Sequence, residues 1–343
     1  MTTESGTAVC PNCGRAVGSG DNFCEGCRTE LAPAAVSGDG PVAATECPAC
    51  HSAQISADGY CESCGHKLPA ARDHIELDLG VLAGVTDKGL RHSRNEDAMA
   101  LATAEQGGHP VALAVVCDGV SSSRRPDEAS LAAVEAAVRV LLAGVREDAD
   151  LLEASKAAVA AAQQALAGLN EPGPEDPPSA TFVSAVLTRE TATLCWLGDS
   201  RAYWLGSGPD AEAKRLTTDD SLAGEMVAAG LVSEDDAMTL PGAHVVTGWL
   251  GADASGTDPH VATFAPPGPG VLLLCSDGLW NYRPGAAELA ELALPGALTD
   301  PLGTARALVG FALEAGGMDN ITVVLAPFPP TASAPEEKPA DEH

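Results

Sequence analysis

Between about residues 75 and 328, short apolar runs alternate with turn signals and with alanine-rich stretches of helical length. The apolar runs end at small or acidic residues, as buried strands do, and cover residues 111–119, 181–188, 192–200, 270–278 and 320–328. Two longer stretches carry acidic residues near their starts and are predicted helices, residues 127–144 and 148–169. Because both short loops and helices link neighbouring strands, the pattern predicts an α+β fold with sheets layered between helices.

Outside this main domain, predicted for residues 75–328, the composition changes. Residues 32–44 are rich in Ala, Gly and Pro and are predicted to be a flexible linker. Residues 329–343 are rich in Pro and charge and are predicted to be a disordered tail. Two cysteine-rich units, residues 8–31 and 45–68, flank the linker.

Eight of the 11 cysteines fall in two sets with one spacing, in which two C-x2-C knuckles are separated by ten residues. The sets are Cys10, Cys13, Cys24 and Cys27, and Cys47, Cys50, Cys61 and Cys64. A two-residue gap lets both thiolates of a knuckle bind one ion, and two knuckles complete a closed tetrahedral zinc site. Each unit is too short to fold on an apolar core, so the metal must supply the folding energy.

Disulfides and iron–sulfur ligation are the alternatives for these cysteines. The doubled spacing, in a chain with cytoplasmic features, favours zinc. The two units resemble zinc ribbons, which implies two structural zinc ions and a structural or partner-binding role. We therefore expect a protein partner for the ribbons.

Charge and hydropathy narrow the choice of partners and compartment. The 343 residues carry a formal net charge of -29, which repels nucleic acid and anionic membranes and also suits a solvated, soluble surface. No run is long and apolar enough to span a bilayer, and the first 13 residues lack the features of a secretory signal. We expect a cytoplasmic monomer that binds neither nucleic acid nor membrane.

Aspartates recur where the apolar runs begin or end. Asp118, Asp199 and Asp277 each follow such a run, whereas Asp97 and Asp319 each precede one. A single Asp-Gly pair is typical of a turn, but five carboxylates beside buried strands are costly unless a divalent cation compensates their charge. Oxygen ligands favour Mg or Mn over Zn. The residues alone therefore indicate an acidic metal site with hydrolytic chemistry.

Two glycines, Gly119 and Gly278, directly follow two of these aspartates. Glycine at these positions permits close approach of the backbone to an ion and a carbonyl ligand. The three cysteines outside the ribbons, Cys117, Cys195 and Cys275, lie in apolar runs and are predicted to be core thiols rather than catalysts.

Over these same residues the chain resembles the type 2C, metal-dependent protein phosphatase family. The matching stretches follow the family's order across nearly all of the main domain: residues 84–98, 114–130, 179–187, 197–205, 216–237, 272–280 and 316–325. The resemblance implies an αββα sandwich of two antiparallel sheets flanked by helices. It also implies hydrolysis of phosphoserine or phosphothreonine in a phosphoprotein, without a phospho-enzyme.

Carried over residue by residue, the resemblance implies two Mn²⁺ or Mg²⁺ ions bridged by Asp118. The remaining implied ligands are the Gly119 carbonyl, Asp277, Asp319, Glu96 and Asp97, the last two directly or through waters, and Asp199 for a weaker third ion. A hydroxide bridging the two ions would attack phosphorus in line with the leaving oxygen. The residues predicted to be catalytic are Asp118, Asp277, Asp319 and His92.

The chain departs from the family in two places. His92 stands where many members have an arginine that grips phosphate, and two readings stay open. Either His92 binds phosphate or acts as an acid, or Arg91 or Arg94 reaches the phosphate while His92 only packs. Residues 121–125, three serines and two arginines, replace the family's Gly-Gly-His, which alters the loop beside the metals or brings an arginine to the substrate.

The competing function is a catalytically weak or inactive scaffold that acts through its ribbons. The retained Asp118, Asp277 and Asp319 argue against it, because a dead site has no need of clustered carboxylates.

Overall fold

A computed structural model describes residues 8–9, 16–17, 26, 35–36, 46–47, 49–54, 56, 60–65, 68, 70–170, 176–208, 211–237, 240, 242–243, 245–254 and 258–330. The four cysteines of the first predicted ribbon and nearly all of the predicted tail lie outside these residues, so their predictions stay untested by the structure.

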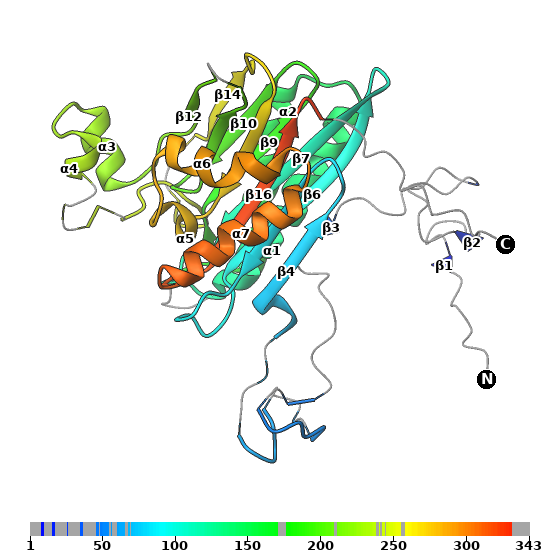
Figure 1. Ribbon diagram of the computed structural model, residues 1–343, viewed down its shortest axis with the longest axis vertical. Coiled ribbons are helices and arrows are strands. Elements are labelled where there is room, and N and C mark those ends of the chain that lie inside the picture. Colours follow the sequence, from blue (N-terminus) through cyan, green and yellow to red (C-terminus); the bar gives the residue numbers. More distant parts are fainter. Residues whose placement is uncertain are drawn as a thin grey trace.

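The main domain is a sandwich of two six-stranded sheets (Figure 1). The first sheet has the order β14-β10-β9-β7-β6-β3. Its strands are β3 (Ala35–Val36), β6 (Asp97–Gln106), β7 (His109–Asp118), β9 (Phe182–Leu187), β10 (Ala192–Leu197) and β14 (His260–Phe264). The second sheet has the order β12-β11-β15-β16-β5-β4. Its strands are β4 (His74–Asp78), β5 (Ala83–Asp87), β11 (Arg201–Gly206), β12 (Ala213–Arg215), β15 (Gly270–Cys275) and β16 (Ile321–Phe328).

Every strand pairing within the two sheets is antiparallel. Two further pairs of short strands lie outside these sheets: β1 (Ala8–Val9) with β2 (Ala16–Val17), and β8 (Ser179–Ala180) with β13 (Leu250–Gly251). A 3-10 helix, η1 (Ala71–Asp73), precedes β4.

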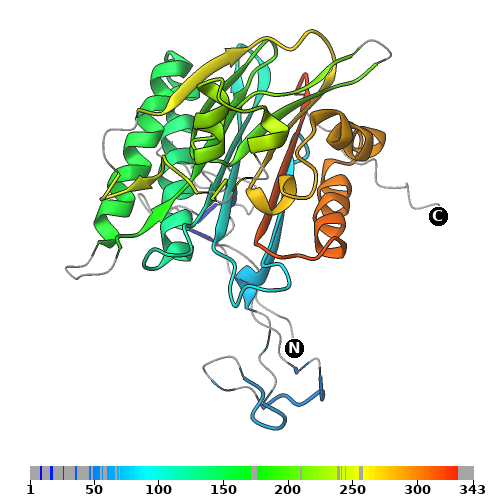
Figure 2. The ribbon, with the colours of Figure 1, turned by 90° about the vertical axis from the view of Figure 1, so that its left-hand side faces the viewer.

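Helices cover the outer face of each sheet (Figure 2). The long helices are α1 (Pro126–Arg146) and α2 (Leu151–Leu169) on the first sheet, and α6 (Ala286–Ala297) and α7 (Pro301–Glu314) on the second. Shorter ones are α3 (Leu222–Ala228), α4 (Glu234–Ala237) and α5 (Asp277–Trp280). The αββα sandwich and its antiparallel sheets are therefore confirmed.

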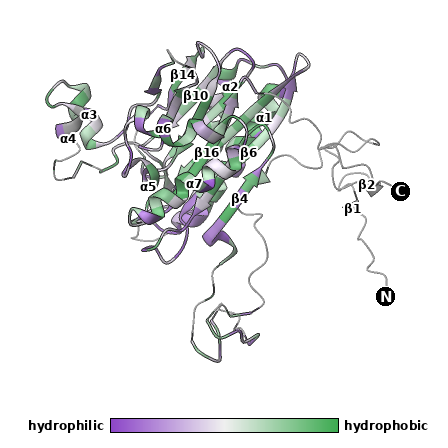
Figure 3. Ribbon diagram, viewed as in Figure 1, coloured by the Kyte–Doolittle hydropathy of each residue, from purple (hydrophilic) through white to green (hydrophobic). Residues whose placement is uncertain are grey.

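Burial on both faces explains why the strands read as continuous apolar runs rather than as alternating patterns. All residues of β9, β10, β11 and β15 are buried, since each strand has helices on one side and the other sheet on the other. The core accordingly forms three layers, one between the sheets and one under each helix pair. Figure 3 shows apolar residues concentrated in the sandwich, with polar residues interspersed along the helices.

Local signals set the starts of the two first long helices. Pro126 occupies the first turn of α1, where its missing N–H costs no hydrogen bond. Asp150 caps α2, because its side chain accepts hydrogen bonds from the backbone N–H groups of Leu152 and Glu153. In the part of the chain that the structure describes, no helix combines the length and apolarity needed to cross a membrane.

One segment differs from its expected role. Ala35 and Val36, inside the predicted linker, pair with Leu101 and Ala100 of β6 and extend the first sheet by one short strand. Val36 is buried and belongs to the core layer that β6 shares with α1. A two-residue apolar pair gives no periodic signal, so sequence reasoning placed it in the linker.

We predict that Gly84→Ala destabilises the sandwich. Gly84 lies in β5 of the second sheet, opposite Met99 of the first sheet. An added Cβ would lie 2.7 Å from Met99 Sδ and 2.9 Å from Val324 Cγ2. Overpacking of this kind costs about 1–3 kcal/mol in the free energy of unfolding, measurable by urea denaturation. The control is Gly310→Ala in α7, where a Cβ meets nothing within 4 Å and should stabilise by up to about 1 kcal/mol. Equal stability of the Gly84→Ala variant and the wild type would contradict the prediction.

Candidate metal centre

The topology brings the five aspartates to one end of the sandwich. Asp97 begins β6 and Asp118 ends β7, and the two are directly paired in the antiparallel register. Asp277 follows β15, and Asp319 precedes its neighbour β16. Asp199 lies in the turn from β10 to β11, which crosses between the sheets at the same end.

Their charges act on one another. Burial and the charges of Asp97, Asp277, Asp319 and Asp199 raise the pKa of Asp118 well above the usual carboxyl range. Burial, then Asp199, Asp319 and Asp97, raises the pKa of Asp277 in the same way. Burial raises the pKa of Asp97 and of Asp199 to about 7 each, with neighbouring carboxylates adding to it. A cluster with this much mutual repulsion stays fully ionised only beside a compensating positive charge.

Two buried oxygens test whether a cation fits. Asp97 Oδ2 accepts hydrogen bonds from Ser276 Oγ and Thr322 Oγ1, both at 2.7 Å, and Asp277 Oδ2 accepts one from Asn281 Nδ2 at 3.0 Å. Within the described residues, Asp97 Oδ1 and Asp277 Oδ1 are buried without any hydrogen-bond partner. Unpaired buried carboxylate oxygens are costly, and such oxygens are the ligands that hard divalent cations prefer. The residues present therefore fit a Mg²⁺ or Mn²⁺ site.

A buried network holds the other oxygen of Asp97. Thr322 donates its hydroxyl proton to Asp97, so at the 2.7 Å contact with Thr86 it must accept. Thr86 in turn accepts from Asn95 Nδ2 at 2.9 Å, and Asn95 Oδ1 accepts from the Asp97 N–H at 3.2 Å. The network runs in one direction and orients Asp97. Sequence reasoning missed Thr86, Asn95, Ser276 and Thr322, since single hydroxyl and amide residues in or beside strands carry no distinctive signal.

At positions 119 and 278, neighbouring backbone leaves room for no side chain larger than that of glycine. A Cβ on Gly119 would lie 2.3 Å from the Pro126 carbonyl oxygen and 2.8 Å from that of Glu96. A Cβ on Gly278 would lie 1.9 Å from the Asn320 carbonyl oxygen. Each glycine thus lets another segment approach the centre closely.

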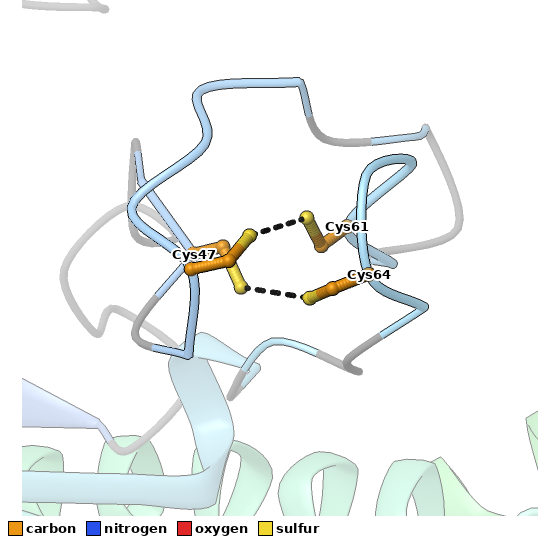
Figure 4. A group of neighbouring side chains, drawn as sticks. Cys47, Cys61 and Cys64 are labelled. Carbon is orange, nitrogen blue, oxygen red and sulfur yellow. Dashed lines mark hydrogen bonds between the residues drawn. The ribbon is translucent and has the colours of Figure 1, made fainter.

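A separate cysteine cluster lies in the second predicted ribbon (Figure 4). The sulfurs of Cys47, Cys50, Cys61 and Cys64 all lie within 4.8 Å of one another. The Cys47–Cys64 and Cys50–Cys61 pairs are 3.6 and 3.5 Å apart, close to the roughly 3.8 Å between ligands of a tetrahedral zinc with Zn–S bonds of about 2.3 Å. All four thiols are free of disulfides, so they fit one closed zinc site. Among the described residues, no three carboxylates bring oxygens within 4.8 Å of one another in this way.

Comparison with known proteins agrees with this geometry. Residues 90–290 match the protein phosphatase 2C family. The chain belongs to that family. Residues 10–68 match the double zinc ribbon, which forms its N-terminal part.

Relatives cover most of the family domain. The serine/threonine phosphatase stp of Listeria welshimeri serovar 6b is 30% identical over 256 residues, covering 70% of this chain and 92% of that protein. The solved structure of PstP/Ppp from Mycobacterium tuberculosis has 27% identity and a TM-score of 0.56, covering 72% of this chain and 97% of that one. A PstP catalytic domain in complex with 2 manganese ions has 25% identity and a TM-score of 0.54, covering 71% and 96%.

Glu96 lies at the centre, but its carboxylate is already engaged. Its Oε1 accepts from Arg94 Nε at 2.9 Å and its Oε2 from Ser121 Oγ at 2.6 Å. Its backbone N–H donates to Asn320 Oδ1 at 2.8 Å. The serine that departs from the family pattern therefore holds a candidate ligand, and Glu96 suits contact with an ion through water.

His92 lies between two candidate ligands. Its Nε2 is 3.1 Å from Asp319 Oδ1, and its Nδ1 is 3.9 Å from Glu96 Oε2. Arg94 also lies 3.6 Å from the Asp127 carboxylate, whereas Arg91 is exposed. The structure thus brings His92 and Arg94 to the carboxylates more closely than Arg91.

Two further expectations concern the loop and the core thiols. Arg125, at a positive φ of 51°, pairs with Glu128 in the first turn of α1.

Cys117, Cys195 and Cys275 are fully buried, and burial raises the pKa of each thiol, that of Cys195 to about 12. Their reading as core thiols is confirmed.

We predict that Thr322→Val weakens the fold. The change keeps the side chain's shape but removes the hydroxyl that links Thr86 to Asp97, which leaves buried polar groups short of a partner. The free energy of unfolding in urea should fall by about 1–3 kcal/mol. The matched control, Thr322→Ser, keeps the hydroxyl and should lose less. If the valine variant were as stable as the serine variant, the network would not hold Asp97.

Proposed function

We propose that this member of the protein phosphatase 2C family is a protein serine/threonine phosphatase that requires Mn²⁺ or Mg²⁺. The observation that carries the proposal is the pair of buried, unpartnered oxygens on Asp97 and Asp277 inside a cluster of five aspartates. The names of the relatives, serine/threonine phosphatases, supply the substrate class, phosphoserine and phosphothreonine in proteins.

The residues that would hold the metal are the carboxylates of Asp118, Asp277, Asp319 and Asp97, with the Gly119 carbonyl, Glu96 through water, and Asp199 at a weaker further site. The PstP structure with 2 manganese ions supports a binuclear centre. When bound, the cations supply an acidified water as nucleophile and positive charge for the phosphate oxygens.

The chain's own residues position the substrate. The phosphate-binding candidates are Arg91, His92 and Arg94. His92 touches Asp319 and faces Glu96, which supports a role at the centre rather than packing alone. Arg94 is held by Glu96, so its remaining guanidinium N–H groups are fixed beside the carboxylates. The planar fork of guanidinium donors can bind two oxygens of a phosphate at once.

We further propose that the ribbons hold two structural zinc ions and bind a protein partner, and that the protein is a cytoplasmic monomer. The alternative, an inactive scaffold, is not favoured. In a scaffold, the mutual repulsion of five aspartates and the bare oxygens of Asp97 and Asp277 would destabilise the fold without serving a function.

We predict that Asp277→Asn lowers turnover of a phosphopeptide by at least about 100-fold, because the centre loses a charged ligand. Activity should also vanish in chelator-treated protein and return with Mn²⁺ or Mg²⁺. The control is Asp258→Asn, an exposed carboxylate that should leave kcat unchanged. Full activity without metal, or a near-normal rate for Asp277→Asn, would refute the assigned centre.

We also predict two zinc ions per chain by elemental analysis. Cys61→Ser should remove one of them, since a closed site with three thiolates binds zinc far more weakly. Hydrolysis of a small phosphate ester should stay largely unchanged, because all candidate carboxylates lie outside the ribbons. The matched control, Cys195→Ser in the core, should keep both zinc ions. Iron in place of zinc, or two zinc ions in the Cys61→Ser variant, would count against the prediction.

A further inference from the structure

The segment that carries α3 and α4, residues 221–246, leaves and rejoins the sandwich at a single point. The Asp220 carbonyl accepts a hydrogen bond from Thr247 N at 2.7 Å, and Ser221 forms a bridge with Val246. Figure 1 shows α3 and α4 standing out from the sandwich on the side where α5 lies. We call residues 221–246 the excursion, and Asp220 directly precedes it.

Asp220 bonds the turn that carries the candidate ligand Asp199. Its Oδ2 accepts from Gly198 N at 2.9 Å, and its backbone N–H donates to the Gly198 carbonyl at 2.9 Å. Its Oδ1 lies 2.7 Å from His260 Nε2 of β14. The Asp220 side chain is 16% exposed, whereas the His260 side chain is 42% exposed, so the bond to Gly198 is the more shielded of the two.

His260 is itself held in place. Its ring stacks on Trp196 with centroids 5.0 Å apart and an interplanar angle of 17°. Trp196 Nε1 donates to the Thr218 carbonyl at 2.8 Å, two residues before Asp220. The Asp220 carboxylate is therefore fixed from both its own segment and β14.

The preceding residue reaches the other side of the same turn. Asp219 accepts from Arg201 Nε at 3.0 Å and Nη2 at 2.6 Å. The Arg201 guanidinium lies 3.5 Å from the ring centroid of Trp280, whose Nε1 donates to the Asp199 carbonyl at 2.9 Å. Two consecutive aspartates thus hold the Asp199 turn, one through Gly198 and one through Arg201 and Trp280.

The turn also connects to Asp118. Gly198 has a φ of +101°, and a Cβ there would lie 2.9 Å from Thr181, so the turn packs closely on that residue. Thr181 Oγ1 contacts Ser200 Oγ at 2.8 Å and accepts from Asp118 N at 3.1 Å. A shift of the turn would therefore reach a second candidate ligand.

We propose that Asp220 is a positioning residue that holds Asp199 at the metal centre. Asp220 acts through Gly198 and touches no reacting atom. Both of its side-chain bonds reach segments outside α3 and α4. The cap of α3 is supplied instead by Ser221 Oγ, which accepts from Gly224 N at 3.1 Å. The inference rests on the proposed function, because it assumes that Asp199 holds a cation.

The test is calorimetric titration of chelator-treated full-length protein with MnCl₂. Asp199→Asn identifies the binding step that depends on Asp199. Asp220→Ala should weaken that same step by about 10–100-fold, the usual effect of losing a group that orients a ligand. Asp220→Asn should rescue most of it, because its amide oxygen can accept from Gly198 N and its amide nitrogen can donate to a neutral His260.

Ser221→Ala is the matched control, since it removes the α3 cap and leaves the turn intact. It should leave the manganese isotherm unchanged and alter at most KM for a phosphopeptide. Asp220→Ala should instead lower kcat for p-nitrophenyl phosphate as well, a substrate too small to need the excursion.

An Asp220→Ala isotherm equal to wild type, or equal shifts in Asp220→Ala and Ser221→Ala, would overturn the inference while the proposed function stands. A wild-type protein that binds no manganese would overturn both. Thermal unfolding in chelator checks that each variant folds. If Asp220→Ala does not fold, His260→Ala replaces it, with a smaller shift of the same step expected and an unchanged isotherm overturning the inference.

Discussion

Mutual repulsion among buried carboxylates is the constraint on which the rest of this structure depends. Burial, and then the charges of four other aspartates at one end of the sandwich, raise the pKa of the Asp118 carboxyl. The antiparallel register makes this unavoidable, since it sets Asp97 directly opposite Asp118. A fold can keep such an arrangement ionised if neutral donors orient the carboxylates and a cation compensates the remaining charge. The centre has neutral donors on one oxygen of Asp97 and of Asp277, and it leaves a bare second oxygen on each where a cation would bind.

The donors are neutral, and this choice has a consequence. A lysine or arginine bonded to Asp97 would cancel its charge and compete with a metal. Serine and threonine hydroxyls instead orient the carboxylate and leave its charge available. Arg94 pairs with Glu96 and Asp127, and the buried Arg201 pairs with Asp219, so neither guanidinium neutralises Asp97.

The sequence predicted the strands that are buried on both faces, because burial of this kind produces long apolar runs such as residues 270–278. It also predicted the aspartates at their ends, although the resemblance supplied the sandwich topology. The rest depended on register. Thr322 and Asp97 are 225 residues apart, and Asp220 and Gly198 are 22 apart, so no local spacing marks either pair. Hydroxyl and carboxylate residues are common beside strands, and only the pairing of β5 with β16 brings Thr86 to Thr322. The strand at Ala35 and Val36 was missed for a different reason, since two apolar residues are too few to form a pattern.

The two kinds of metal site differ in how they relate to folding. Around the second ribbon, the described core consists of Cys47, Cys61 and Leu68 alone, so the metal ligands are themselves the interior. Such a unit gains its stability from the ion. The carboxylate centre instead lies at the edge of three large apolar layers, which exist whether or not a cation is bound. The hydrogen bonds to Asp97, Asp277 and the Asp199 turn add to this preorganisation. Without divalent cations we therefore expect the sandwich to stay folded, with the repulsion among the aspartates uncompensated. Without zinc we expect the second ribbon to lose its structure, because its described interior consists mainly of the metal-binding cysteines.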